Sequence, residues 1–434
     1  MRDAVFLLVM LGLLPLAVYR PFAGVLLWCW ISFMNPHRLL FGFAVELPWA
    51  LAVFAATLLG IVLTGEYRRA RTDGLTWLLI ALLVCITVTS VTALGPPSEV
   101  WAKHDGVMKV IIGLLVTSAL LVDRRRIHAL VWAMVIAIGY YGVRGGIFSL
   151  LTGGNYRVFG PVQTMIADNN HLAAAMLVTL PLMNYLRLQS QHRIVRVGLA
   201  IAMALTLISV VGSYSRGALL GLVAVAALMW WRSHAKVISA AMLTVALAGA
   251  ITVMPPQWME RMNSIGEYQA DDSASERLVL WGISWKLAVQ RPLLGSGFAG
   301  PYTREVVDQV APGGPARAVH SIWFELLGEQ GFVTFAVWLA MTLLAIYWSQ
   351  LMLSRTRGIP RLAWAHDLAR MTQVSIVAYL VSGSFLSLSY WDFYWTVLVV
   401  VGATWSVARR TLAEEAPQKV RRPAPALAPG WRAA

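Results

Sequence analysis

The chain has 434 residues, of which 58% are hydrophobic and only 13% are charged. Soluble globular domains carry roughly 25% charged residues, so this composition excludes an ordinary soluble protein. The formal net charge is +14. Because the basic residues gather between apolar segments, we interpret the excess as the Lys/Arg bias of loops on one side of a membrane, and we expect no nucleic-acid partner. Cys29 and Cys85 lie inside apolar segments and indicate neither a disulfide framework nor a metal site.

Apolar segments of the length that crosses a bilayer recur along the chain as far as position 408. They predict an all-α, polytopic integral membrane protein with about 12 transmembrane helices, or 13 if residues 1–34 split at Arg20-Pro21. The predicted spans are 4–34, 45–64, 75–94, 106–122, 127–150, 170–186, 194–212, 217–231, 237–254, 321–350, 371–388 and 393–408.

Basic clusters occupy every second connection between these spans, so all of them fall on one side of the membrane. By the positive-inside rule that side is the cytoplasm, and both ends of the chain lie there. The clusters cover 65–74, 123–126, 187–196, 231–236, 354–370 and the segment from Arg409. We therefore predict a transmembrane domain over 1–408, an outward-facing loop over 255–320 within it, and a basic, disordered cytoplasmic tail over 409–434.

The outward loop over 255–320 is long enough to need structure of its own, and part of it has the signature of a helix. Ser273 and Glu276 match a capping box, in which both side chains satisfy free backbone N–H groups at a helix start. Arg291-Pro292 and the glycines that follow end the predicted helix. Its expected apolar stripe, which could pack on the membrane surface or on neighbouring spans, consists of Leu278, Trp281, Trp285 and Ala288.

Three basic or titratable residues are predicted at outward helix N-termini. Arg216 begins the span after the SYS turn, with Ser213 or Ser215 as its cap. Arg277 falls in the first turn of the loop helix, and His320 directly precedes a span. Because the positive end of a helix dipole disfavours cations, this pattern indicates an anion bound between the three residues. Guanidinium groups bind phosphate oxygens in bidentate fashion, so the expected anion is a phosphate.

Each of these residues also has an ordinary explanation. Arg216 could extend to the lipid headgroups. Arg277 could pair with the carboxylates at positions 271, 272 and 276, and His320 could be an ordinary interfacial histidine. The combined pattern favours the anion site over these alternatives.

Further candidates lie at the same outward boundary. Arg157 and Asn170 belong to a polar segment before a span, and Asn170 could line a polar cavity. His171 could line the same cavity, and Asp168 or Asn169 could simply cap the following helix. Asp392 lies within SYWDFYW, whose aromatic residues are expected first as an interfacial belt, although aromatic rings beside a carboxylate also suit sugars.

The sequence contains no Walker-type phosphate loop, HExxH, GxSxG or Asp-rich metal motif. ATP hydrolysis and metalloprotease chemistry are therefore not expected. Because nucleotides are scarce outside the cytoplasmic membrane, a transferase at the outward face needs a donor held in the membrane. A polyprenyl diphosphate sugar fits, since its diphosphate would lie at the boundary where the arginines are.

Four segments carry a family resemblance. They are RVFGPVQTMIADNNHLAAA at 157–175, SRGALL at 215–220, ERLVLWGISWKLAVQRPLLGSGF at 276–298 and HSIWFELLGEQGFVTF at 320–335. In this order and spacing they resemble the O-antigen ligase and polymerase superfamily of bacterial membrane proteins. Residues 1–44 and 254–278 are also similar to a narrower subgroup, the O-glycosylation ligases associated with exosortase A systems. One departure is Ser321, where the family often has Asn.

The resemblance implies a GT-C-like glycosyltransferase that needs no metal and no cofactor and inverts the anomeric centre. It would transfer a glycan from undecaprenyl diphosphate to an acceptor hydroxyl at the periplasmic face of the bacterial inner membrane. The resemblance assigns Arg216 and Arg277 to the diphosphate, which they would stabilise as it leaves. It assigns His320 either as general base or, when protonated, as a diphosphate ligand. The positions implied to contact substrate are Arg157, Asp168, Asn170, Gly217, Trp281 and Glu325.

The sequence leaves the acceptor open. A ligase would attach the glycan to a lipid A core, a protein or a polysaccharide, whereas a polymerase would use the same donor to lengthen another lipid-linked glycan. A transporter or flippase of lipid-linked sugars is the alternative from another class. Few charges lie at mid-span and no repeat is evident, which favours the enzyme. The expected partners are the lipid-linked donor, an acceptor and membrane lipids.

Overall fold

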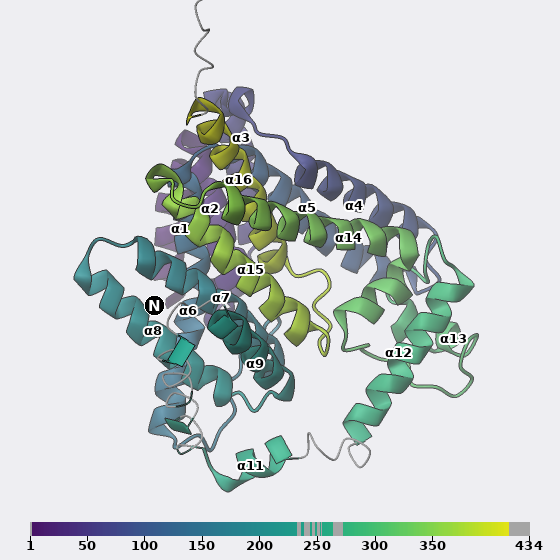
Figure 1. The fold of residues 1–434 in the computed structure, drawn as a ribbon. Coiled ribbons are helices and arrows are strands. Elements are labelled where there is room, and N and C mark those ends of the chain that lie inside the picture. Colours follow the sequence, from purple (N-terminus) through teal and green to yellow (C-terminus); the bar gives the residue numbers. More distant parts are fainter. Residues whose placement is uncertain are drawn as a thin grey trace, which may run out of the picture.

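The computed structural model describes residues 2–231, 254–263 and 272–415, with isolated positions at 236–237, 244, 248–249 and 252. Within this part every regular element is helical, so the predicted all-α architecture is confirmed (Figure 1). The α-helices are α1 (Arg2–Tyr19), α2 (Pro21–Met34), α3 (Trp49–Thr64), α4 (Gly74–Val91), α5 (Pro97–Leu120), α6 (Arg124–Leu151), α7 (Asn169–Gln189), α8 (Arg193–Val211), α9 (Arg216–Trp231), α11 (Pro256–Asn263), α12 (Asp272–Gln290), α13 (Arg304–Val307), α14 (Ile322–Arg355), α15 (Ala363–Gly383) and α16 (Asp392–Glu415).

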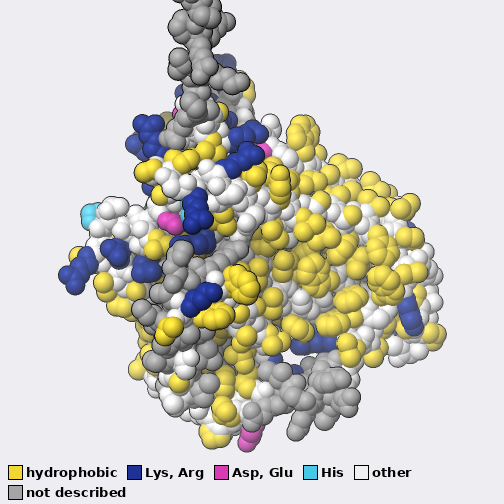
Figure 2. All heavy atoms as spheres, viewed as in Figure 1, with side chains coloured by type: hydrophobic (Ala, Val, Ile, Leu, Met, Phe, Trp, Pro, Cys, Tyr) yellow, Lys and Arg dark blue, Asp and Glu magenta, His cyan; other side chains and the backbone are white. Residues whose placement is uncertain are grey.

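Several of these helices have the composition of membrane spans. Among the described residues, α1, α4, α6, α8 and α14 are long and apolar enough to cross a bilayer, and α2, α3 and α9 are shorter apolar helices. Hydrophobic side chains dominate the face over α4, α5 and α14, where few Lys or Arg side chains are visible (Figure 2). These features fit a multi-pass helical membrane protein. The count of about 12 crossings stays a prediction, and the expected span at 237–254 lies largely outside the described residues.

Residues 2–34 form two helices separated by a single residue. The first helix ends at Tyr19, and the second begins at Pro21 after Arg20. Proline suits the first position of a helix because its missing N–H would have no partner there and its ring already fixes φ. Both helices pack against α3. The predicted break at Arg20-Pro21 is therefore confirmed as a helix boundary.

The helices around α7 and α15 frame the outward-facing residues predicted above. α7 packs against α6, α8, α9 and α15, and α15 also packs against α9, α14 and α16. The loop helix α12 packs along α14. Segments that are distant in the sequence are thereby brought to one end of the bundle.

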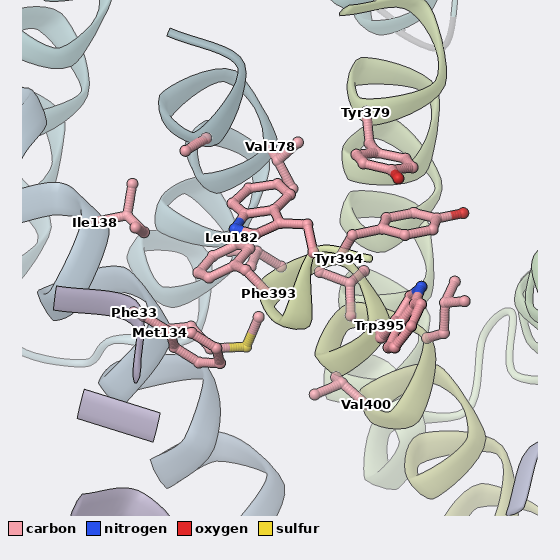
Figure 3. Close-up of a cluster of buried hydrophobic side chains, with 14 of the residues drawn as sticks. Phe33, Met134, Ile138, Val178, Leu182, Tyr379, Phe393, Tyr394, Trp395 and Val400 are labelled. Atoms are coloured by element: carbon pink, nitrogen blue, oxygen red, sulfur yellow. The ribbon is translucent and has the colours of Figure 1, made fainter. Parts of the chain in front are cut away.

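The aromatic run at the start of α16 is buried in the protein. The rings of Tyr379 and Tyr394 stack with centroids 3.6 Å apart, and Phe393 and Trp395 are fully buried beside them (Figure 3). The carboxylate of Asp392 accepts a hydrogen bond from a serine of α2. The expected interfacial belt is therefore wrong for this run, because α16 packs against α4, α5, α6, α14 and α15 and leaves these side chains no contact with solvent or lipid.

The predicted loop helix is present as α12, but it buries a different face from the one expected. The positions buried against the protein are Leu280, Ile283, Ser284, Leu287 and Ala288. Leu278 and Trp285, two of the four residues in the expected stripe, are 56% and 48% exposed. The close approach of α14 explains the difference, because a Cβ added to Gly328 would lie only 3.0 Å from the Cβ of Ser284. The packing partner, and not apolar spacing alone, selects the face of this helix.

Two element boundaries also differ from the prediction. α5 begins at Pro97, so most of the connection expected over 95–105 is helical. α16 continues to Glu415, beyond the expected domain end at 408, because Leu412 still packs on the core and the first helix-breaking residue is Pro417. The remaining tail, 416–434, lies outside the described residues. So does the side chain of Ser273, the predicted cap, whose backbone is already inside α12.

The long helix α14 is interrupted at Gly331, and the turn after α12 fills the interruption. Gly331 has φ 73° and ψ −177°, a backbone conformation that is essentially confined to glycine. The N–H of Gly297 donates to the carbonyl of Glu329 at 2.7 Å. In the opposite direction, the N–H of Phe332 donates to the carbonyl of Pro292 at 2.8 Å. The Pro292–Gly297 turn thus satisfies backbone groups that the interrupted helix leaves without intrahelical partners.

Replacing Gly331 should destabilise the fold strongly. A Cβ at this position would lie 2.7 Å from the backbone nitrogen of Gly295 and 2.9 Å from the carbonyl oxygen of Pro292, in addition to the backbone strain. We expect Gly331→Ala to lower the free energy of unfolding by about 2–4 kcal/mol. Gly282→Ala is the matched control, since nothing lies within 4 Å of its added Cβ, and it should be neutral or slightly stabilising. Thermal unfolding in detergent, followed by circular dichroism, checks both; equal midpoints would contradict this account of the turn.

Candidate functional site

The turn before α9 is held by its own hydrogen bonds. Tyr214 has a left-handed backbone with φ 61°. The Ser215 hydroxyl accepts the N–H of Ala218 at 3.1 Å and so caps α9, as predicted for one of the two serines. The Ser213 hydroxyl donates to the carbonyl of Val210 at 2.6 Å. The buried serines therefore fix the turn, and the next residue, Arg216, is the first residue of α9 as expected.

Hydrogen bonds with other segments of the chain also hold this turn. The Asn169 amide donates to the carbonyl of Ser213 at 2.7 Å, and the Tyr214 hydroxyl donates to the carbonyl of Gly154 at 2.7 Å. The indole N–H of Trp258 on α11 donates to the last residue of α8 at 2.9 Å. The guanidinium of Arg157 lies 5.8 Å from the centroid of the Tyr214 ring. Arg157, a predicted substrate-contact residue, thus lies beside the turn that carries Arg216.

A small cavity brings together two arginines that are distant in the sequence. Its lining residues are Asn170, Ser215, Arg216, Gly217, Arg277, Phe385 and Leu386, and its volume is about 40 Å³. That volume holds no more than a few water molecules, so a larger ligand would extend out through its mouth. Arg216 and Arg277 are both half-buried beside it. The cavity also includes the predicted substrate-contact residues Asn170 and Gly217.

Arg277 reaches this cavity from a different helical position than predicted. α12 begins at Asp272, so Arg277 lies in its second turn and not its first. The argument from the helix dipole therefore does not apply to Arg277, since the dipole acts mainly within the first turn. Its neighbour Glu276 forms an ion pair with Arg317. The convergence of the two arginines results from the packing of α12.

His320 lies in a strained loop next to this cluster. Its backbone is left-handed with φ 53°, and its N–H donates to the hydroxyl of Ser387 at 2.9 Å. Burial lowers the pKa of His320, and the positive charge of Arg277 lowers it further, although Asp168 and Glu325 act in the opposite direction. The imidazole is therefore neutral at pH 7, the form that can accept a proton.

Trp281 connects α12 to the loop that carries His320. Its indole N–H donates to the carbonyl of Val319 at 3.1 Å, and its ring stacks on Phe324 with centroids 5.3 Å apart. Through these contacts it positions His320 relative to Arg277. Trp281 does not line the cavity between the arginines, so the structure supports a positioning role for it.

Asp168 and Asn170 form the capped start of α7. Asp168 accepts hydrogen bonds from the Asn170 backbone N–H at 2.8 Å and from its side-chain amide at 2.9 Å. Burial raises the pKa of Asp168, but these hydrogen bonds outweigh that effect and the net shift is downward, so the group is ionised at neutral pH. The predicted cap is confirmed. It also orients Asn170, which lines the cavity.

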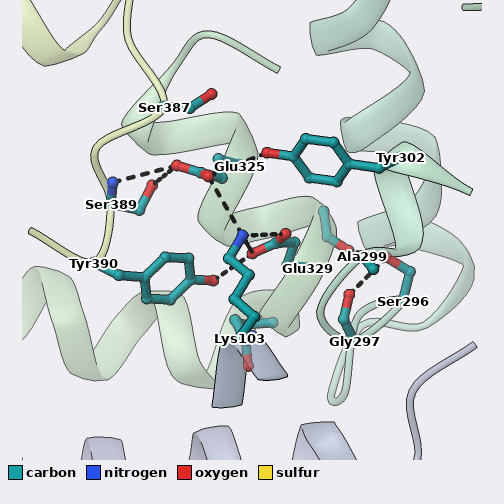
Figure 4. Close-up of polar contacts among 12 residues, drawn as sticks. Lys103, Ser296, Gly297, Ala299, Tyr302, Glu325, Glu329, Ser387, Ser389 and Tyr390 are labelled. Carbon is teal, nitrogen blue, oxygen red and sulfur yellow. Dashed lines mark hydrogen bonds and ion pairs between the residues drawn. The ribbon is translucent and has the colours of Figure 1, made fainter. Parts of the chain in front are cut away.

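Two buried carboxylates of α14 share a half-buried cation, Lys103, which sequence reasoning missed (Figure 4). The ammonium of Lys103 on α5 lies 2.7 Å and 3.0 Å from the two carboxylate oxygens of Glu329 and 3.6 Å from Glu325. The Tyr390 hydroxyl donates to Glu329 at 2.7 Å. Both carboxylates lie four residues apart on α14, a spacing that places them on one helix face. Nothing local in the sequence indicates that Lys103 would meet them.

Glu325 was expected to contact substrate, but its carboxylate bonds to the protein. It accepts the backbone N–H of Ser389 at 3.2 Å and the Ser389 hydroxyl at 2.6 Å. The Tyr302 hydroxyl donates to its other oxygen at 3.4 Å. These contacts tie the loop before α16 to the start of α14, directly beside His320. The arrangement favours a positioning role for Glu325.

Comparison with known families supports the resemblance at a coarse level. Residues 1–191 match a family of unknown function (DUF5935). Residues 201–339 match the O-antigen ligase family. The O-antigen ligase segment contains Arg216, Arg277 and His320, together with the turn that fills the interruption in α14. It supports the O-antigen ligase superfamily and, in general terms, a glycan-transferring activity, whereas the exosortase-associated subgroup stays a prediction. No curated protein matches the chain.

Removing Lys103 should destabilise the fold, because the buried carboxylates would lose their cation. We expect Lys103→Met to lower the free energy of unfolding by about 3 kcal/mol, because Glu329 would remain buried without its cation. Lys109→Met on the same helix is the matched control: its pair with Asp105 is exposed and should contribute less than about 1 kcal/mol. Thermal unfolding midpoints in detergent check the difference. Adding Glu329→Gln to Lys103→Met should recover part of the loss; no recovery would argue against the ion pair as its cause.

Proposed function

We propose that this protein is a metal-independent, inverting glycosyltransferase that moves a glycan from undecaprenyl diphosphate to an acceptor hydroxyl. The observation that carries the proposal is the shared cavity of Arg216 and Arg277, with the neutral imidazole of His320 within electrostatic reach of Arg277. The match of residues 201–339 to the O-antigen ligase family supports the same reaction class.

The two arginines would act on the leaving group. As the bond between the anomeric carbon and the diphosphate oxygen breaks, its electron pair passes to the diphosphate. Arg216 and Arg277 would balance that developing charge through charge-assisted hydrogen bonds. Ser215, Arg216 and Gly217, at the N-terminus of α9, line the same cavity, so the positive end of this helix dipole would add to the charge of the arginines.

His320 would act on the acceptor. A neutral imidazole can take the proton from the acceptor hydroxyl as its oxygen attacks the anomeric carbon from the side opposite the diphosphate, which inverts that centre. Among the described residues, no three His, Cys, Asp or Glu side chains form a group suited to a metal ion. Metal independence remains part of the proposal.

The site lies at the end of the bundle opposite a basic cluster. α6 begins with Arg124–Arg126 and runs for 28 residues, roughly 40 Å, to Leu151. Just beyond that end, Gly154 accepts the Tyr214 hydroxyl. If the basic cluster marks the cytoplasm, the site faces the periplasm of a bacterial inner membrane and the C-terminus is cytoplasmic. This orientation belongs to the proposal.

We favour a ligase, which transfers the glycan to a lipid, protein or polysaccharide acceptor. A polymerase would use the same arginines and the same donor. The two differ in the acceptor and therefore in the product, so the assay must identify what carries the glycan after transfer. A flippase would move the donor without releasing undecaprenyl diphosphate.

Loss of either arginine should abolish transfer without unfolding the protein. With purified protein in nanodiscs and a lipid-linked glycan donor, we expect Arg216→Ala and Arg277→Ala to slow release of undecaprenyl diphosphate by about 10²-fold or more. Arg304→Ala is the control, because that arginine is exposed, pairs with Asp308 and lies outside the cavity. Mass spectrometry of the products separates ligase from polymerase. Full activity in both cavity variants would refute the diphosphate assignment.

The pH dependence of transfer should report the state of His320. Its pKa is lowered from the usual value of about 6.5. The base form therefore predominates at pH 7, and the rate should stay nearly level above neutral pH and fall as the pH drops through the lowered pKa. The residual rate of His320→Ala should lack this acidic limb. A rate that rises as the pH falls would instead support a protonated His320 bound to the diphosphate.

A further inference from the structure

A second, larger pocket lies at the other end of the bundle. It has a volume of about 660 Å³, within the range of ligand sites, and forms where α1 ends, α2 begins and α3 runs into the short helix at Glu66–Arg69. The start of α6 closes one side with Arg126. Because α6 runs roughly 40 Å from this pocket to the arginine cavity, the two sites are separate.

The pocket carries more positive charge than its own carboxylate can balance. Arg20, Arg68, Arg69 and Arg126 line it together with one acidic residue, Glu66. Glu66 already forms a bidentate ion pair with Arg126, at 2.8 Å and 3.2 Å. The remaining three arginines thus contribute an excess of positive charge. Within the described part of the chain, no carboxylate forms an ion pair with Arg20 or Arg69.

The remaining wall of the pocket is apolar and continues onto the outer surface of the bundle. Phe22, Ala23 and Leu26 of α2 line it, and Arg126 lies 5.2 Å from the centroid of the Phe22 ring. Next to the pocket, α1 and α3 expose Leu16 and Val62, both on helices with the composition of membrane segments. A ligand that fits this arrangement has an anionic head and an apolar tail.

We propose that this pocket binds the phosphate headgroup of an anionic glycerophospholipid, with Arg20, Arg68 and Arg69 around the phosphate and the acyl chains along α1 and α3. Guanidinium groups match phosphate oxygens in bidentate fashion. Basic pockets between membrane helices are suited to such headgroups. The site would hold a lipid at the break between α1 and α2. This inference does not rest on the proposed transferase activity, because none of its residues lines the arginine cavity.

The test compares an anionic lipid with a zwitterionic lipid on the full chain. Native mass spectrometry in detergent would measure retention of dioleoyl phosphatidylglycerol and of dioleoyl phosphatidylcholine, which share the same acyl chains. We expect the wild type to prefer phosphatidylglycerol, and Arg20→Gln/Arg69→Gln to bind it roughly 10- to 30-fold more weakly. Arg125→Gln/Arg193→Gln is the matched control, since both residues are exposed arginines on the same side and neither lines the pocket.

Two further measurements complete the test. The first asks whether the pocket binds a lipid or free phosphate, and the second uses another variant in case the first does not fold. Inorganic phosphate alone should fail to displace phosphatidylglycerol at millimolar concentration; if it displaces the lipid, the ligand is a free anion and the lipid assignment is wrong. Arg68→Gln/Arg69→Gln, confined to exposed positions of one short helix, repeats the test if the first variant fails to fold. Equal retention of the two lipids, or equal loss in the pocket and control variants, would overturn the proposal.

Discussion

The interruption of α14 at Gly331 is the constraint on which the arrangement of the site depends. A helix in an apolar surrounding must satisfy its backbone groups internally, and a break frees several of them. Here the Pro292–Gly297 turn donates to and accepts from the broken helix, including the 2.7 Å bond between Gly297 and Glu329. That pairing locks the end of α12 onto α14. Once α12 is fixed in this way, Arg277 and Trp281 have to lie beside the start of α14, where His320 is.

The two buried carboxylates of α14 also hold this region in place through their hydrogen bonds and ion pairs. Two carboxylates on one face of α14 would be costly to bury alone, and Lys103, Tyr390 and Ser389 compensate for them. The partners come from α5 and from the loop before α16. Through Ser387, that loop also accepts the N–H of His320. The network therefore works as a scaffold for the loop that carries His320.

Arginines line a concave site at each end of the bundle, but the two sites differ in size and in the polarity of their walls. At the end of the bundle that carries the turn before α9, two half-buried arginines line a cavity that holds no more than a few water molecules. Under the proposed function they would bind the part of a larger ligand that extends out of this cavity. At the other end, a wide pocket combines three arginines in excess with an apolar wall, which fits the anionic lipid headgroup proposed above. In both places, arginines outnumber carboxylates within a concave site, and this excess is what indicates an anionic ligand. Net charge alone would not distinguish them from ordinary surface arginines.

The sequence by itself determined what depends on neighbouring residues. Apolar length predicted the helices, Pro21 marked the break after Arg20, Ser215 and Asp168 marked helix starts, and Arg291-Pro292 marked the end of α12. Each of these follows from local backbone chemistry, which acts within a few residues and leaves a visible pattern.

Only the tertiary structure decided which distant segments meet. It placed Arg277 beside Arg216 although Arg277 lies in the second turn of its helix, turned a different face of α12 inward, and buried the aromatic run around Asp392. The pairing of Lys103 with Glu329 joins residues 226 positions apart. Such contacts depend on the packing of whole helices against one another. A single sequence carries no local signal for that packing, because the same apolar face can be buried by any complementary neighbour.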